Sequence, residues 1–171
     1  SHDLDEALRL GDRISIMHNG RIVQTGSAQD IVLRPADDYV AEVVRHMNPL
    51  TVLTGAMIMR KCGQMDRADG ALYLDDARRY QLKLDSQQAP VELRLDGQPH
   101  PLRVVGDDAV CAEDERAVIV APASLSLQSL IDLRRRTGHP VLLAEGGQVL
   151  GVCGETEIIC ALAARGPGVA A

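Results

Sequence analysis

Apolar positions in the first part of the chain predict a helix, a hairpin and two further helices. The first helix starts at Asp3, which forms a D-x-x-E capping pattern with Glu6. Its apolar residues Leu4, Ala7 and Leu8 follow at helical spacing, and Gly11 is where the helix would end. Residues 13–18 and 21–25 are predicted strands. The Asn-Gly pair between them is the strongest two-residue hairpin signal, because both turn positions favour positive φ.

Two shorter helices complete this part of the chain. Ser27 and Asp30 start the first, which ends near Arg34 because the residue before a proline disfavours the helical conformation. Asp37 or Asp38 caps the second. The apolar face of this last helix consists of Tyr39, Val40, Val43, Val44 and Met47.

The middle of the chain starts at a predicted boundary, residues 47–49, where a proline opposes continuation of the helix. A short strand is predicted at residues 72–74, and the two aspartates that follow are predicted to cap one turn of helix over residues 77–80. Alternating apolar residues at 91–95, an Asp-Gly turn and a returning run at 102–105 predict a hairpin with one buried face.

Residues 118–164 predict one compact α/β unit in the order strand, helix, strand, strand, helix. Its first strand covers residues 118–120, and Ser124 or Ser126 caps a helix that ends at Gly138. The remaining elements are a strand at 141–143, a Gly-Gly turn, a partner strand at 149–153 and a helix that starts at Glu155 or Thr156. The predicted fold class is therefore α/β, or α+β.

Composition excludes several classes of protein. Aromatic residues make up only 2% of the chain, with no Phe or Trp, and the net charge is −6, so we expect no nucleic-acid partner. No apolar stretch approaches the length that spans a bilayer. The four cysteines include no C-x-x-C pair, which predicts reduced thiols in a cytosolic protein and no metal site.

The order of elements over residues 1–48 resembles the end of the ATP-binding subunits of ABC importers. The likeness lies in the opening Ser-His-Asp, in the run at residues 11–26 and in the Arg-Pro-Ala-Asp-Asp-Tyr-Val run at residues 34–40, which is similar to the version in importers of glycine betaine, proline or choline. The resemblance implies that His2 is the catalytic switch histidine at the γ-phosphate of ATP. An imidazole there donates a hydrogen bond to developing charge and orients the attacking water.

That resemblance also implies an intact parent that is an ABC-type transport ATPase using ATP and Mg²⁺. Its partners would be a second copy of the subunit, a transmembrane permease and a periplasmic or lipid-anchored substrate-binding protein. The subunit itself would be a peripheral protein at the cytoplasmic face of the bacterial inner membrane. The G-x-x-x-x-G-K-[ST] phosphate loop does not occur in these 171 residues. We therefore expect a C-terminal fragment that is inactive by itself, with residues 1–48 as the end of the ATPase domain.

The unit at residues 118–165 resembles a CBS domain, a module that pairs in tandem and often senses adenine nucleotides. The residues that carry the likeness are His139 to Leu143, the Gly146-Gly147 turn and Val149 to Ile158. The chain departs from the family pattern at Gly154, where a hydroxyl residue is expected, and at Glu157, the position of the ribose-binding Asp. Residues 49–117 would be a degenerate first CBS-like half, and residues 166–171 a tail.

Importers of quaternary amines carry tandem CBS modules behind the ATPase domain, so the two resemblances support each other. Three roles for the module remain open: sensing an adenine nucleotide through Glu157, responding to ionic strength, and dimerisation. Arg134-Arg135-Arg136 and Arg78-Arg79 are either a contact for anionic lipid headgroups or, in the case of the triplet, a solvated helix end. The alternative for the whole chain is a non-catalytic CBS-type sensor or dimerisation module with a vestigial ATPase remnant.

Overall fold

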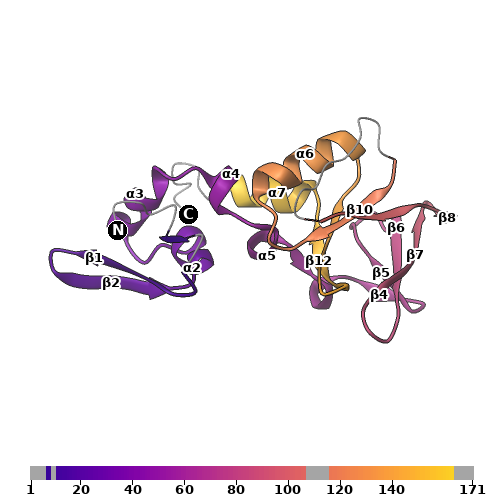
Figure 1. Cartoon of the computed structure of the whole chain (residues 1–171), viewed down its shortest axis with the longest axis horizontal. Coiled ribbons are helices and arrows are strands. Elements are labelled where there is room, and N and C mark those ends of the chain that lie inside the picture. The colour runs from indigo at the N-terminus through magenta and orange to yellow at the C-terminus, as the bar shows by residue number, and fades with distance from the viewer. Residues whose placement is uncertain (1–6, 9–10, 107–115, 164–171) are drawn as a thin grey trace. The chain divides into compact units, whose positions relative to one another are not determined.

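The computed structural model describes residues 7–8, 11–106 and 116–163. The chain folds into two compact units. The first contains the described residues up to Leu53 together with those from Cys160, and the second contains the described residues from Thr54 to Ile159 (Figure 1). Residues 49–53, assigned by sequence to the following module, lie in the first unit.

The predicted first helix lies mostly outside the described residues, of which residues 7–8 are helical. A hairpin follows in the first unit. Strand β1 (Ile14–His18) pairs antiparallel with β2 (Arg21–Gly26). The predicted turn is confirmed, with φ values of 50° at Asn19 and 76° at Gly20.

The two predicted helices are confirmed. Helix α2 (Ala28–Leu33) has a capping box in which the Ser27 hydroxyl accepts the N–H of Asp30 and the Asp30 carboxylate accepts the N–H of Ser27. Asp37 caps α3 (Asp38–Arg45), and a third short helix, α4 (Pro49–Val52), has proline at its first position. The buried residues of these helices are Ala28, Ile31, Val32, Val40, Val44 and Val52.

Two side chains of the hairpin, Gln24 and His18, contact the helical part of the first unit. The amide of Gln24 on β2 donates to the carbonyl of Arg34 at 3.0 Å and accepts the N–H of Ala36 at 2.9 Å. It thereby satisfies backbone groups in the connection from α2 to α3, where the helix end and Pro35 leave them without helical partners. The ring of His18 also stacks on that of Tyr39, with centroids 3.7 Å apart.

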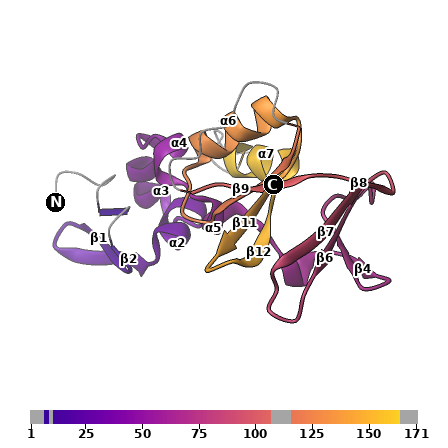
Figure 2. The same ribbon diagram turned by 45° about the vertical axis from the view of Figure 1, so that its right-hand side comes forward.

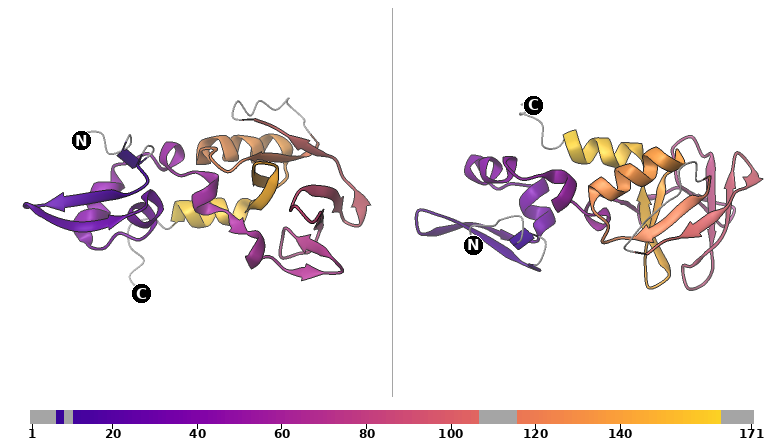
Figure 3. Two further views of the ribbon diagram at one scale, coloured as in Figure 1. Left: turned by 60° about the horizontal axis from the view of Figure 1, so that its bottom comes forward. Right: turned by 45° about the horizontal axis from the view of Figure 1, so that its top comes forward.

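The second unit contains a five-stranded mixed sheet with the strand order β3-β12-β11-β10-β9. Its strands are β3 (Arg60–Lys61), β9 (Leu102–Val104), β10 (Val118–Pro122), β11 (Val141–Glu145) and β12 (Gln148–Cys153). Strands β9, β10 and β11 are parallel, whereas β12 is antiparallel to β11 and to β3. Helices α6 (Leu127–Thr137) and α7 (Glu155–Ala163) pack on one face of this sheet (Figure 3).

A second, antiparallel sheet has the strand order β4-β5-β6-β7-β8. Its strands are β4 (Arg67–Ala68), β5 (Ala71–Tyr73), β6 (Tyr80–Leu84), β7 (Pro90–Leu95) and β8 (Gln98–Pro99), shown in Figure 2 beside the mixed sheet. Helix α5 (Gly55–Ile58) and the 3₁₀ turn Cys62–Gln64 are single turns that flank β3.

The strand–helix–strand–strand–helix order predicted for residues 118–164 is observed from β10 to α7. Ser126 is the N-cap of α6, and Gly138 ends that helix with a φ of 70°. Residues 54–106 are different: no helix there exceeds one turn, and strands dominate. The described part of the expected first CBS-like half thus has its own architecture.

Two local predictions in that region are wrong. The run at 102–105 does not return along 91–95, because β9 pairs in parallel with β10 in the other sheet and β7 pairs with β6 and β8. Val91 is 66% exposed, so the alternating face is only partly buried. Residues 77–80 form no helix, because the Asp75 carboxylate accepts the N–H groups of Arg79 and Tyr80 and holds a turn that leads into β6.

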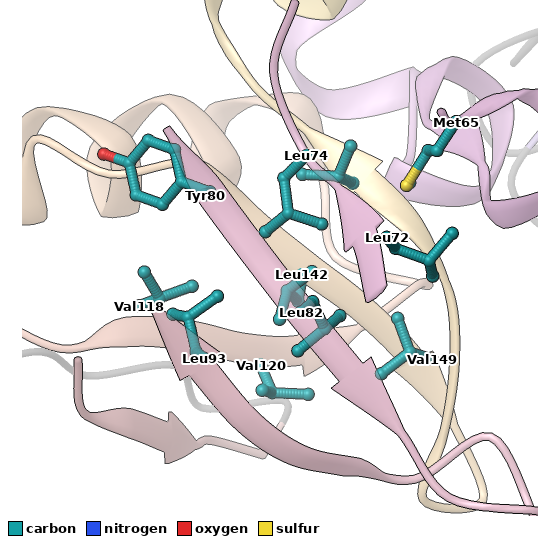
Figure 4. Packing of buried hydrophobic residues seen from close by; sticks show 11 residues of the cluster. Met65, Leu72, Leu74, Tyr80, Leu82, Leu93, Val118, Val120, Leu142 and Val149 are labelled. Carbon is teal, nitrogen blue, oxygen red and sulfur yellow. The ribbon is translucent and has the colours of Figure 1, made fainter. Parts of the chain in front are cut away.

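Two apolar layers cover the two faces of the mixed sheet. Between the sheets, Leu82 and Leu93 of the second sheet meet Val118 and Leu142 of the first (Figure 4). On the helical face, Leu130 of α6 packs against residues that include Ile119 and Leu143. Burial of each such Leu or Val side chain contributes about 1.5–3 kcal/mol, so these layers hold the unit together.

A polar contact closes one end of the layer between the sheets. The hydroxyl of Tyr80 on β6 lies 2.8 Å from Nδ1 of His139, just before β11. The ring of His100, between β8 and β9, meets the His139 ring edge-on at 4.6 Å. Burial, His100 and Arg134 lower the pKa of His139 below 6.5, whereas its hydrogen bond to the backbone carbonyl of Arg116 acts to raise that pKa.

This lowered pKa predicts a pH-dependent stability. The folded unit binds the His139 proton more weakly than the unfolded chain does. The contribution of neutral His139 to the free energy of unfolding is therefore full above pH 6.5 and is lost as the pH falls below 6.5 toward the folded pKa. Urea unfolding of the chain at a series of pH values from about 7.5 to about 5 should show this decline. The variant His139→Gln, which keeps one acceptor and one donor but does not titrate, should show a shallower decline. An identical decline in both proteins would contradict the assignment.

Candidate functional site

The predicted catalytic residue, His2, lies outside the described residues, as do Ser1 and Asp3. Its role at the γ-phosphate therefore stays a prediction. The structure does describe residues 11–53, in which the hairpin and the capped helices α2 and α3 form in the order that the sequence predicts. The contacts of Gln24 were not predicted.

The second candidate residue, Glu157, lines a polar pocket of about 240 Å³ in the second unit. The pocket lies where the start of α7 meets the end of α6. Three arginines border it, Arg60 from β3, Arg79 from before β6 and Arg134 from α6, together with the acidic residues Asp75, Asp76, Glu155 and Glu157. Four acidic groups against three basic ones leave the pocket without an excess of positive charge.

Within the pocket, Glu157 is engaged by the protein itself. Its Oε2 accepts the N–H of Gly154 at 2.8 Å, and its Oε1 lies 3.4 Å from Nε of Arg60, an ion-pair distance without hydrogen-bond geometry. The Glu157 side chain is only 10% exposed. It thus stabilises the first turn of α7, where acidic groups favour the positive end of the helix dipole.

Gly154 and Glu157, the two departures from the CBS pattern, fit each other. A Cβ at position 154 would lie 3.2 Å from Oε2 of Glu157, closer than ordinary van der Waals contact. The glycine therefore leaves room for the longer carboxylate to fold back onto the backbone N–H. This geometry gives Glu157 a structural role in the absence of ligand.

Arg60 is a pocket residue that sequence reasoning missed. Its guanidinium donates to the carbonyl of Leu74 and to Asp76, the latter at 2.8 Å, and so connects β3 to the loop before β6 as well as to α7. No local pattern marks it, because its partners lie far away in the sequence. Tyr80, which also borders the pocket, has a pKa raised by burial.

The basic residues considered for lipid contact are mostly paired within the protein. Arg134 lies 3.5 Å from Glu155, and Arg135 lies 3.8 Å from Asp132. The second cluster is paired as well: Arg78 contacts Asp66 and Arg79 contacts Asp96. Local pairing offsets the positive charge that would attract an anionic surface.

The thiols form no site in the described part of the chain. Cys153 is buried, and burial followed by the charge of Glu157 raises its pKa to about 12, which makes the thiol inert. Cys62 is half-buried, and its Sγ lies 3.4 Å from the carbonyl of Val149. Among the described residues, no group of three or more His, Cys, Asp or Glu side chains is placed to hold a metal ion. None of the described helices is long and apolar enough to cross a membrane.

Comparison with known proteins gives a consistent result for the beginning of the chain. No protein-family model matches. The glycine betaine transport ATP-binding protein of Bacillus subtilis is 46% identical over 61 residues, 36% of this chain and 15% of that protein. The glycine betaine/proline betaine transport system ATP-binding protein of Escherichia coli is 48% identical over 61 residues, with the same shares. The choline transport ATP-binding protein of Bacillus subtilis is 50% identical over 44 residues, 26% of this chain and 12% of that protein.

The chain therefore spans only about 15% of the length of these relatives. The matches confirm the resemblance to ABC importer ATP-binding subunits that the Ser-His-Asp start and the runs at residues 11–26 and 34–40 indicated. They do not extend that support to the CBS-like part. The N-terminal third of this chain is homologous to the ATP-binding subunits of ABC importers for glycine betaine, choline and related osmoprotectants.

Proposed function

We propose that the chain is the C-terminal part of the ATP-hydrolysing subunit of a bacterial importer for choline, glycine betaine or a related osmoprotectant. The observation that carries this proposal is the identity of 46–50% to such subunits over the N-terminal third. In the intact subunit, ATP and Mg²⁺ would be held by parts of the ATPase domain that these 171 residues do not contain, including the phosphate loop.

In this proposal His2 is the switch histidine of the intact subunit. Its imidazole donates a hydrogen bond to the γ-phosphate as negative charge develops and orients the attacking water. The hairpin and the helices up to Arg45 follow His2 in the sequence, and Gln24 joins the hairpin to the connection between α2 and α3. In this proposal the subunit lies on the cytoplasmic side of the inner membrane. Its partners are a second copy of the subunit, a transmembrane permease and a periplasmic or lipid-anchored substrate-binding protein.

The second unit has a regulatory and dimerising role in this proposal. Two ATPase subunits close on two ATP molecules, and the appended modules shift the balance between the open and closed states. The layered architecture supports a rigid module, since both faces of the mixed sheet are covered by apolar layers. We leave anionic lipid out of the proposed partners because Arg134, Arg135, Arg78 and Arg79 are paired within the protein.

The alternative function is a non-catalytic sensor with a vestigial ATPase remnant. In that case the polar pocket would bind an adenine nucleotide, with Glu157 at the ribose. The three arginines that border the pocket favour this function, although its volume of about 240 Å³ is below the roughly 300–1,000 Å³ that is typical of ligand sites. The contacts of Glu157 with Gly154 and Arg60 oppose it, because a ribose would have to displace them.

Replacement of His2 tests the catalytic part of the proposal. In the intact parent subunit, His2→Ala should lower ATP turnover about a hundredfold or more, as the loss of one donor to developing oxyanion charge typically does. His46→Ala is the matched control, since it removes an exposed histidine at the end of α3. Phosphate release by the assembled transporter measures both. Equal turnover in His2→Ala and the unmodified subunit would contradict the assignment.

Nucleotide titration separates the two roles of the second unit. Calorimetry of the 171-residue chain with ATP and with AMP should give no binding heat, because Glu157 is already engaged. A binding heat that Glu157→Gln abolishes and that Glu42→Gln, an exposed carboxylate of α3, leaves intact would instead establish the sensor.

A further inference from the structure

A second cavity, of about 340 Å³, lies at the carboxyl ends of strands β9, β10 and β11. These three strands are parallel, so their ends meet at one edge of the sheet, the place where open α/β sheets commonly bind ligands. Val104, Pro122 and Ala144 line it from the three strands, and Pro90 at the start of β7 borders it. Its volume is typical of a site for a small molecule.

The cavity exists because the side chains at this edge are small. Where β10 and β11 end, the lining residues include Ala123 and Ala144, and the Gly146-Gly147 turn follows with no side chains. Val104 lies beside Val120 in the strand register, yet it is 74% exposed, so the second sheet does not fill this end of the layer. At the opposite end, Tyr80 and Val118 fill the same layer (Figure 4).

The charge of the cavity comes from one carboxylate. Glu145, the last residue of β11, is the one charged side chain among the described residues that line the cavity, and no Lys, Arg or His accompanies it. In the described part of the chain Glu145 has no ion-pair partner. The N–H groups of the first turn of α6 do not offset it, because α6 begins beyond the lining residues and the Ser126 hydroxyl accepts the N–H of Ser129.

An apolar wall with a single unpaired carboxylate at its rim is complementary to a small cation with alkyl groups. We propose that this cavity binds an alkylammonium ion of the size of choline, with its methyl groups against Val104, Pro122 and Ala144 and its charge near Glu145. None of the described residues that line the cavity is aromatic, so these residues offer no cation–π attraction and we expect weak affinity, on the order of millimolar. The proposal needs neither ATP nor His2, and it stands whether or not the chain belongs to a transport ATPase.

Binding to the 171-residue chain is measured by amide NMR shifts on addition of choline, with 3,3-dimethyl-1-butanol as the uncharged analogue of the same shape. Choline should shift the amides of residues 104–105, 123–124 and 144–147 in a saturable way, and the alcohol should bind more weakly. Glu145→Gln should weaken choline binding about two- to fivefold, the range of one partly exposed ion pair, and should leave the alcohol unaffected.

Two further variants complete the test. Val104→Lys places a cation at the mouth of the cavity on an exposed edge-strand position, which tolerates lysine, and should also weaken choline binding. Glu42→Gln removes the same charge as Glu145→Gln from a remote exposed site on α3 and should leave choline binding unchanged. Absence of saturable shifts, equal binding of choline and the alcohol, or equal effects of Glu145→Gln and Glu42→Gln would each overturn the proposal.

Discussion

The second unit depends on one constraint: its mixed sheet is buried on both faces. Val118 and Val120 of β10 face the second sheet, whereas Ile119 and Ala121 face the helices. A strand buried on both sides needs an uninterrupted apolar run rather than an alternating one, and β10 and β11 have such runs. The antiparallel sheet has a single buried face, which is why β6 alternates between buried and more exposed positions.

Most of the local structure could be predicted from the sequence because it depends on short-range chemistry. The Asn19-Gly20 turn, the Ser126 cap and the left-handed Gly138 are each determined by a few neighbouring residues. Strand pairing depends on distant residues, so the sequence did not reveal that β9 leaves the hairpin and joins β10. For the same reason the sequence did not indicate the role of Arg60 on β3, whose partners lie in the loop before β6 and in α7.

The site residues illustrate the difference between a family pattern and the chemistry of one chain. The CBS pattern places a ribose ligand at Glu157, but the structure gives this carboxylate the N–H of Gly154 and the guanidinium of Arg60. Two departures from the pattern compensate each other and preserve the start of α7. The edge at the carboxyl ends of the parallel strands has no such internal partners, and Glu145 there lies unpaired in the described part of the chain. In the second unit, the edge at the carboxyl ends of the parallel strands is therefore better suited to bind a ligand than the position of Glu157.

The proposed function requires an ATPase domain whose nucleotide-binding parts are encoded before Ser1. The sequence of the reading frame that precedes Ser1 tests this claim most directly. The account predicts a G-x-x-x-x-G-K-[ST] phosphate loop in that frame, because in P-loop ATPases this loop supplies the backbone N–H groups and the lysine that hold the phosphates of ATP. An upstream frame that contains no phosphate loop would contradict the claim.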